Sequence, residues 1–250
     1  MGIATGRAGT LRPVANTNQP HTRPSLTTRR LEALSDGVIA IAATLLVLEI
    51  KNVPLGTKSL TDSLLERWPS YLGYLISFVV IGLIWVAHHG MFERVHAVDR
   101  QLLFLNLALL LLVGFIPFPT EILATFIREG GIDASVAAAF YSLVMTLIGV
   151  VFTLQWWHLV NHPHLMVDTV TEKQLRRSLR MSSVSPIVYG ISIPLAFLSP
   201  WICVVVYIGL SGYFARGPSA RALIAMQRAA DEATGITPPS ELDLDTRDET

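Results

Sequence analysis

Long apolar runs dominate the middle of the chain and alternate with short polar segments. A helix needs about 20 mostly apolar residues to cross a bilayer, and we expect spanning helices over about 31–50, 70–92, 102–123, 134–159, 178–198 and 201–215. Only Ser199 and Pro200 separate the last two runs, so these runs form either a tight helical hairpin or a pair with one re-entrant member. The pattern predicts an all-α integral membrane protein with six transmembrane helices.

Polar segments flank the apolar runs at both ends of the chain. Residues 1–28 carry scattered Arg, Pro and Thr and lack the apolar centre of a signal peptide, so we expect a disordered cytoplasmic arm there. Residues 217–250 end in an acidic, proline-containing stretch, which predicts a cytoplasmic tail that is partly disordered. Residues 29–216 between them form the expected six-helix transmembrane domain.

Basic residues are distributed unevenly over the segments between the runs. With the N-terminus inside the cell, the inner segments hold 14 Lys and Arg residues, whereas the outer segments hold Lys51, Lys58, Arg67 and Arg128, distal Arg247 being left out. Loops rich in Lys and Arg stay on the cytoplasmic side of a membrane. We therefore expect a multi-pass protein of the plasma membrane with both termini in the cytoplasm.

Composition supports a lipid environment and argues against several function classes. The chain is 51% hydrophobic and 15% charged, against roughly 25% charged in soluble domains. Its net charge is zero, which gives no general attraction to nucleic acid. The single cysteine, Cys203, lies in an apolar run and is expected to be a small core residue. No phosphate-binding loop, dinucleotide fingerprint or nucleophile elbow occurs, so we expect neither an enzyme nor a cofactor.

The first apolar run contains an acidic residue, Asp36, near its start. A carboxylate inside a membrane is costly and needs a partner. With successive positions about 100° apart on a helix, Asp36 lies on one stripe with Ala40, Ala43 and Val47. The small residues of this stripe would let another helix approach closely, so we expect Asp36 to face protein.

A second stripe of the same run is apolar. Ile41, Leu45 and Leu48 follow the spacing i, i+4, i+7, and Thr44 lies at their edge. Periodicity alone favours simple packing of this stripe within a helix bundle. The alternative is that the stripe faces something other than its own subunit.

Further polar residues occur in the first three runs, at similar depth in the expected topology. A buried network of these groups could satisfy its members and fix the helix register; a proton relay through histidine is the alternative. We favour structural locking, because nothing in the sequence continues a relay across the membrane. The candidate members are Arg30, Ser35, Asp36, Trp85, His88, His89 and Asn106.

The start of the first run resembles a family signature. Arg30, three residues, and then Leu34-Ser35-Asp36-Gly37 before AIAATLLVLEI resemble the Arg-xxx-Phe-Ser-Asp motif of the TMEM175 potassium channels. Leu34 stands where the family usually has Phe, which keeps bulk and loses aromatic contacts.

Two further fragments are similar to the same family. They are Trp85-x-x-His88-His89 in the second run, and Asn106 with Ile116-Pro117-Phe118 in the third. The resemblance covers residues 30–216 approximately.

The resemblance implies a homotetramer, because bacterial members carry one six-helix repeat and place four first helices around a pore. It makes Ile41 the narrowest ring of that pore, followed by rings of Leu45 and Leu48, and it associates Thr44 with potassium preference. It also assigns the Arg-Ser-Asp network to Arg30, Ser35, Asp36, Trp85, His88, His89 and Asn106. The implied function is passive, potassium-selective cation conduction.

Such a pore would differ from the common potassium filter of backbone carbonyls in TVGYG loops, which this sequence lacks. A ring of isoleucine side chains offers no ligand and gates by dewetting, so modest selectivity is expected, with Thr44 hydroxyls assisting. A ring of Glu49 at the outer end would concentrate cations at the pore mouth. A surface environment shared by Glu49 and Lys51 is the alternative.

Two rival classes remain, a proton-coupled secondary transporter and a membrane enzyme or scaffold, and the sequence shows no catalytic constellation for an enzyme. A proton-coupled secondary transporter could use Asp36 and the histidines, but the two halves of the chain show no convincing similarity.

His158 and His162 have the i, i+4 spacing of metal ligands. No Cys or carboxylate completes that set in the sequence, so we expect loop histidines beside an interfacial aromatic belt and no resident metal.

Overall fold

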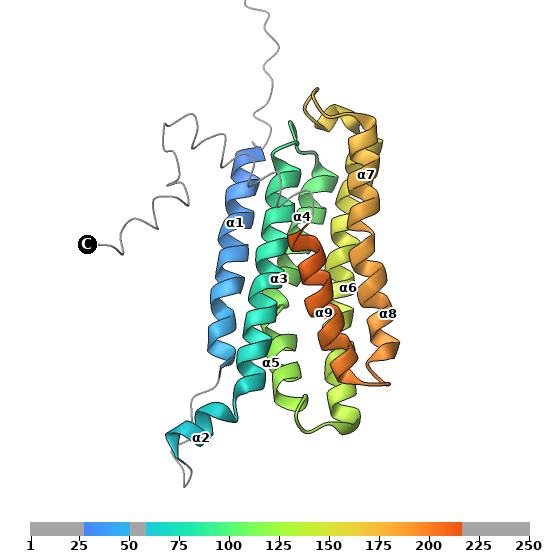
Figure 1. Ribbon diagram of the computed structural model, residues 1–250. Coiled ribbons are helices and arrows are strands. Elements are labelled where there is room, and N and C mark those ends of the chain that lie inside the picture. The colour runs from blue at the N-terminus through green and yellow to red at the C-terminus, as the bar shows by residue number, and fades with distance from the viewer. Residues whose placement is uncertain (1–27, 51–58, 217–250) are drawn as a thin grey trace, which may run out of the picture.

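The computed structural model describes residues 28–50 and 59–216. The long helices run side by side along one axis, α5 continues the line of α4 and α8 that of α7, and the short α2 projects from one end of the bundle (Figure 1). In chain order the elements are α1 (Thr28–Leu45), η1 (Leu46–Glu49), α2 (Leu60–Leu65), α3 (Trp68–Phe92), α4 (Arg100–Phe115), α5 (Pro117–Phe126), α6 (Gly131–Asn161), η2 (Pro163–Leu165), α7 (Glu172–Ser182), α8 (Val184–Leu195) and α9 (Pro200–Ala215). The expected disordered arm and tail lie outside the described residues, except that Thr28 already begins α1.

Four helical segments are long and apolar enough to cross a membrane: α1 with η1, α3, α4 with α5, and α6. The all-α membrane fold is thereby confirmed. The fifth expected span begins in the charged helix α7, and α9 is apolar but has only 16 residues. The fifth and sixth spans therefore remain predictions.

Two of the expected runs are broken into shorter helices. Helix α4 ends at Phe115 and α5 begins at Pro117, which has no N–H to donate to the helical hydrogen-bond ladder, although Ile116 between them keeps helical dihedral angles. The run of 178–198 is divided at Ser183 between α7 and α8. Proline lies at the α4–α5 break and serine at the α7–α8 break, and both residue types weaken the helical hydrogen-bond ladder.

Helix α6 is the centre of the bundle and contacts α4, α5, α7, α8 and α9. Its approach to α8 is close at Gly149, where an added Cβ would lie 2.8 Å from Cδ of Pro186. A larger residue at 149 would push the two helices apart. Cys203 is fully buried in the same core, as expected, with its Sγ 3.3 Å from the carbonyl oxygen of Ser192.

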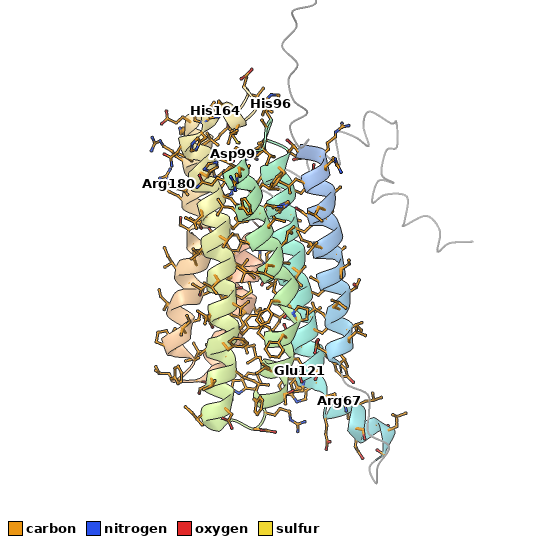
Figure 2. All side chains as sticks on the ribbon, turned by 180° about the vertical axis from the view of Figure 1, so that it is seen from behind. Arg67, His96, Asp99, Glu121, His164 and Arg180 are labelled. Atoms are coloured by element: carbon orange, nitrogen blue, oxygen red, sulfur yellow. The ribbon has the colours of Figure 1, made fainter. Side chains whose placement is uncertain are left out.

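The two ends of the bundle differ in charge. Figure 2 shows Arg67 and Glu121 at one end, and at the other end His96, Asp99, His164 and Arg180. We call the latter the basic end, because α1 begins there with Arg29 and Arg30 and α7 carries Lys173, Arg176, Arg177 and Arg180 there.

The loops of the basic end are held together by specific contacts. The loop after α3 meets the loop after α6 through an antiparallel bridge between Val95 and Met166. Asp99 caps α4 by accepting a hydrogen bond from the Leu102 N–H at 2.8 Å, and its other oxygen lies 2.8 Å from Nε2 of His158 on α6. These contacts fix the starts and ends of the long helices relative to one another.

Candidate functional site

Helix α1 and the η1 turn that continues it have one face that is largely exposed in the subunit. Ile41 is 59% exposed, Leu45 41% and Leu48, in η1, 69%, and Gly37 and Thr44 on the same side are exposed too. We call these five residues the exposed α1 face. Figure 1 shows α1 at the edge of the bundle, beside α3.

The opposite side of α1 is buried in the subunit through Leu31, Ser35, Ile39, Ala42 and Leu46. On a helix these positions lie across the axis from Thr44 and Leu48. The sequence pattern did not single out this stripe, since Leu31, Ile39 and Leu46 resemble the exposed leucines and isoleucine in chemistry. Burial within the subunit is what separates the two faces.

The stripe of small residues lies between these two faces. Asp36 and Ala43 are half-buried, whereas Ala40 and Val47 are exposed. The expectation that this stripe faces protein is met within the subunit at Asp36, whose Oδ1 accepts a hydrogen bond from Nε1 of Trp85 at 2.9 Å. Ala40 and Val47 have their small or branched side chains next to the exposed α1 face.

Three buried polar side chains connect α1, α3 and α4. His88 Nε2 donates to Oδ1 of Asn106 at 2.8 Å, and Nδ2 of Asn106 donates to Oγ of Ser35 at 2.9 Å. Ser35 in turn donates to the carbonyl oxygen of Leu31 at 2.9 Å. All three side chains are fully buried, so these hydrogen bonds satisfy polar atoms that lipid could not, while Nδ1 of His88 has no hydrogen-bond partner among the described residues.

A separate set of groups surrounds His89 at the end of α3. Its Nδ1 lies 2.9 Å from Oε1 of Glu32, and its Nε2 lies 3.4 Å from Oε1 of Glu93. The ring of His89 also stacks on Trp85, with centroids 5.6 Å apart. Glu32 was not singled out from the sequence, although it lies four residues before Asp36 and so on the same side of the helix.

The expected network is therefore divided into three parts, and Arg30 joins none of the hydrogen bonds just described. Its side chain is exposed at the start of α1, at the basic end. Within the described residues, the side-chain hydrogen bonds from α1 to α3 and α4 come instead from Glu32, Ser35 and Asp36.

Thr44 and Glu49 lie at different depths of the exposed side. Thr44 donates its hydroxyl hydrogen to the carbonyl oxygen of Ile41 at 2.9 Å, which leaves the oxygen lone pairs of Thr44 directed away from its own helix. Glu49 ends η1 and is half-buried. Lys51, the alternative partner proposed for Glu49, lies outside the described residues.

His158 lies in the last turn of α6 and not in a loop as expected, whereas His162 and His164 follow the helix, and no group of metal ligands forms among the described residues. His158 is buried against Asp99, and Nδ1 of His162 lies 3.0 Å from the carbonyl oxygen of His158. Burial alone would raise the pKa of Asp99, but the Leu102 N–H and the His158 ring hold it below its usual range. Their arrangement supports a structural role at the basic end.

A second polar cluster lies deep in the bundle and was not predicted. Ser77 Oγ lies 2.7 Å from Oγ1 of Thr120 and 3.2 Å from the hydroxyl of Tyr141. Tyr207 donates to the carbonyl oxygen of Ala138 at 3.0 Å. Single hydroxyl residues in apolar runs give no periodic signal, so only the packing of α3, α5, α6 and α9 reveals this cluster.

Comparison with known proteins places the chain in a family. Residues 30–117 match the family model described as endosomal/lysosomal potassium channel TMEM175. A potassium channel of Streptomyces collinus is 45% identical over 172 residues, which cover 68% of this chain and 82% of that protein.

Two other matches extend the comparison. The crystal structure of a lysosomal potassium-selective channel TMEM175 homolog from Chamaesiphon minutus has a TM-score of 0.67 and 40% identity, covering 75% of this chain and 96% of that one. An endosomal/lysosomal proton channel TMEM175 of Gallus gallus is 38% identical over 141 residues, 53% of this chain and 28% of that protein.

The apolar helical bundle and these similarities define an ion-channel class of membrane protein, and not an enzyme. This chain belongs to the TMEM175 family.

Proposed function

We propose that the chain is a passive, potassium-selective cation channel, built as a homotetramer with four copies of α1 around the conduction axis. The observation that carries the proposal is the exposed α1 face. In a bilayer, a helix that buries one side in its own subunit and leaves Ile41, Leu45 and Leu48 uncovered on the other presents that face to lipid, to a neighbouring subunit or to a lumen. Relatives named potassium channels support this assignment.

The arrangement of α1 favours a pore over lipid contact for this face. Asp36 and Glu32 are half-buried at its flank, and intramembrane carboxylates face bundle interiors or water-filled cavities rather than lipid. With the Asp36 side of α1 turned toward a neighbouring subunit, the exposed α1 face is directed to the axis. Ala40 leaves space there for a close helix–helix approach.

The proposed constriction is apolar. Rings of Ile41, Leu45 and Leu48 would offer no ligand to a cation, so the closed pore would be dry, and conduction would require the α1 helices to rotate or separate. A cation passing such rings keeps part of its hydration shell. Potassium is more weakly hydrated than sodium and therefore crosses at lower cost.

Thr44 is the polar residue that would assist potassium in this proposal. Its hydroxyl hydrogen is already donated to Ile41, so the side that faces the axis presents oxygen lone pairs to a cation. Glu49 would lie at the outer mouth of the pore, where a fourfold ring of carboxylates would raise the local cation concentration. The two residues would act in sequence on the entering ion.

The proposal also includes an orientation of the bundle in the membrane. The basic end would face the cytoplasm of a plasma-membrane protein, since basic residues are retained inside. The α7–α8 pair and α9 would supply the fifth and sixth spans. A set of hydrogen bonds would hold α1 against α3 and α4 without taking part in conduction; its members are Ser35, Asp36, Trp85, His88, His89 and Asn106. Arg30 would lie at the inner mouth of the pore.

A planar-bilayer recording of the purified protein tests this function. With potassium on one side and sodium on the other at equal pH, we expect a reversal potential shifted toward the potassium equilibrium value. A pH gradient at symmetric potassium measures proton conduction in the same bilayer, because the Gallus gallus relative is named a proton channel. A reversal potential that follows the proton gradient alone would contradict potassium selectivity.

A transporter is distinguished in the same preparation. Flux that saturates with substrate and requires a proton gradient would favour the proton-coupled carrier. Open-channel current steps in the absence of a proton gradient would exclude it.

A further inference from the structure

The bundle contains a large apolar cavity that is unrelated to the exposed α1 face. Its volume is about 350 Å³, and it is bounded by α3, α6, the α7–α8 junction and the last turns of α9. Packed protein interiors seldom leave voids larger than a water molecule. Its lining includes Ala87, Phe152, Ser182, Ser211 and Phe214.

The length of α9 explains why the cavity exists. Trp201 at its start stacks on Trp68, the first residue of α3, with ring centroids 5.8 Å apart, so the two helices begin at the same level. Helix α9 ends after 16 residues, about 24 Å along its axis, whereas α3 continues for 25 residues. The apolar core of a bilayer is about 30 Å thick. Part of the groove between α3 and α7–α8 therefore lies beyond α9, within membrane depth and toward the basic end (Figure 1).

The cavity wall is suited to hydrocarbon rather than to water. Most lining side chains are apolar, and two of the serines direct their hydroxyl hydrogens into their own helices: Ser182 to Leu179 at 2.9 Å and Ser211 to Tyr207 at 2.8 Å. The remaining polar side-chain groups of this lining are the hydroxyls of Ser185 and Tyr189, so the wall offers few hydrogen-bond partners to ordered water. Ala87, Ser182, Ser211 and Phe214 are only half-buried, so the cavity is open to the surface of the subunit.

We propose that this cavity binds one acyl chain of a phospholipid from the leaflet at the basic end. Lipid hydrocarbon surrounds a spanning bundle at this depth, and filling the cavity would restore dispersion contacts that the lining atoms otherwise lack. Charge at the same end matches the rest of such a ligand, because Lys173, Arg177 and Arg180 on α7 are exposed there and attract phosphate. The lipid would fill the space beside the last turns of α9 and join this helix to α3 and α6.

The test is lipid retention by the full-length protein, measured by native mass spectrometry after extensive detergent exchange. We expect the wild type to retain about one phospholipid per subunit. Ser211→Phe fills the cavity from α9 and Ala87→Phe fills it from α3, so each should lose that lipid. Val205→Phe is the matched control, because residue 205 is 68% exposed on the outer side of α9, and it should retain the lipid.

A second measurement does not depend on the fillers folding. The unfolding midpoint of delipidated wild type should rise on adding long-chain phosphatidylglycerol and rise less with a short-chain analogue of the same headgroup. Equal shifts for both chain lengths, or equal lipid retention in fillers and control, would overturn the proposal.

Two other occupants give different results. Truncation after residue 216 that creates lipid retention absent from the full chain would identify the C-terminal segment as the occupant. Loss of the oligomer in both fillers, with no lipid in the wild type, would identify a second copy. Either result would overturn the lipid assignment.

Discussion

At the residue scale, the two hydroxyl groups of Ser35 and Thr44 on α1 have different surroundings. The hydroxyl of Ser35 is buried between Asn106 and Leu31, whereas that of Thr44 bonds only within α1 and faces outward. The same functional group is therefore buried inside the subunit at one position and exposed on its surface at the other.

Thr44→Val tests the role proposed for the exposed hydroxyl. The substitution keeps the shape and removes the oxygen, so a cation would lose a ligand worth about 1 kcal/mol at the proposed constriction. We expect the potassium-to-sodium permeability ratio to fall by about fivefold in bilayer recordings, with single-channel conductance retained. Thr44→Ser keeps the oxygen and should keep the ratio; an unchanged ratio in the valine variant would remove Thr44 from ion selection.

Ser35→Ala tests the contribution of the buried hydroxyl. It leaves the Asn106 amide with an unsatisfied donor in a fully buried position, at a cost of about 1–2 kcal/mol. We expect a lower thermal midpoint for the purified protein, followed by tryptophan fluorescence. The matched control is Thr44→Ala, which removes an exposed hydroxyl and should leave the midpoint within error of the wild type.

At the element scale, helix faces were only partly predictable. The 100° periodicity places Ile41, Leu45 and Leu48 on one face, and that face is exposed in the subunit. Periodicity could not identify the buried face, because Ile39 and Leu46 have the same hydrophobicity as their exposed neighbours. Only contact with α3 and α4 separates the two sets.

The network shows the same limit for polar residues. The sequence brings Ser35, His88 and Asn106 together by depth, but depth does not assign partners. His89 follows His88 directly on α3, so its side chain points about 100° away from that of His88 around the helix. It contacts Glu32 and Glu93 rather than Asp36.

The bond between Asp36 and Trp85 couples α1 to α3, and a double-mutant cycle measures this coupling. Asp36→Ala and Trp85→Phe each remove the same 2.9 Å hydrogen bond, so the double variant should lose little more than the worse single variant. We expect the tetramer fraction, measured by light scattering after gel filtration, to fall while ion selectivity is retained. Additive losses would show that the two residues act independently.

Asp99 couples α4 to α6, and its two roles can be separated. Asp99→Ala removes both the α4 cap and the partner of His158, and should cost about 1–2 kcal/mol. Asp99→Asn keeps a good cap and should cost less. The measurement is the thermal midpoint of each purified variant at neutral pH.

The stability that Asp99 contributes should also depend on pH. The folded pKa of Asp99 lies below its unfolded value of about 3.9. Its stabilising contribution is therefore complete above that unfolded pKa and is lost as pH falls through the folded pKa. The wild type should lose this increment at acid pH, whereas Asp99→Asn should not; equal acid sensitivity would contradict the assignment.

At the scale of the whole molecule, apolar run length predicted the helical membrane fold, and α1, α3, α4–α5 and α6 confirm it. The remaining two runs were harder because their helices depend on context. Helix α7 is charged and its extent is set by a Thr171–Gln174 capping box, while α9 is short. The cavity at the end of α9 follows from that difference in helix lengths, which hydropathy alone does not give.

The central claim is that the exposed α1 face lines a water-filled path in the assembled protein. Ile41 is 59% exposed in the subunit and Ile191 on α8 is 55% exposed, so exposure alone does not distinguish them. Only a pore would bring water to residue 41 and leave lipid at residue 191.

The decisive measurement is modification of single cysteines by a charged, membrane-impermeant thiol reagent during bilayer recording. Ile41→Cys, Ile191→Cys and the buried Ile39→Cys are compared in a Cys203→Ser background. We predict rapid modification and block of current for Ile41→Cys only, and faster modification when the channel is open. Unchanged current and no labelling at residue 41, in channels that conduct, would contradict the account.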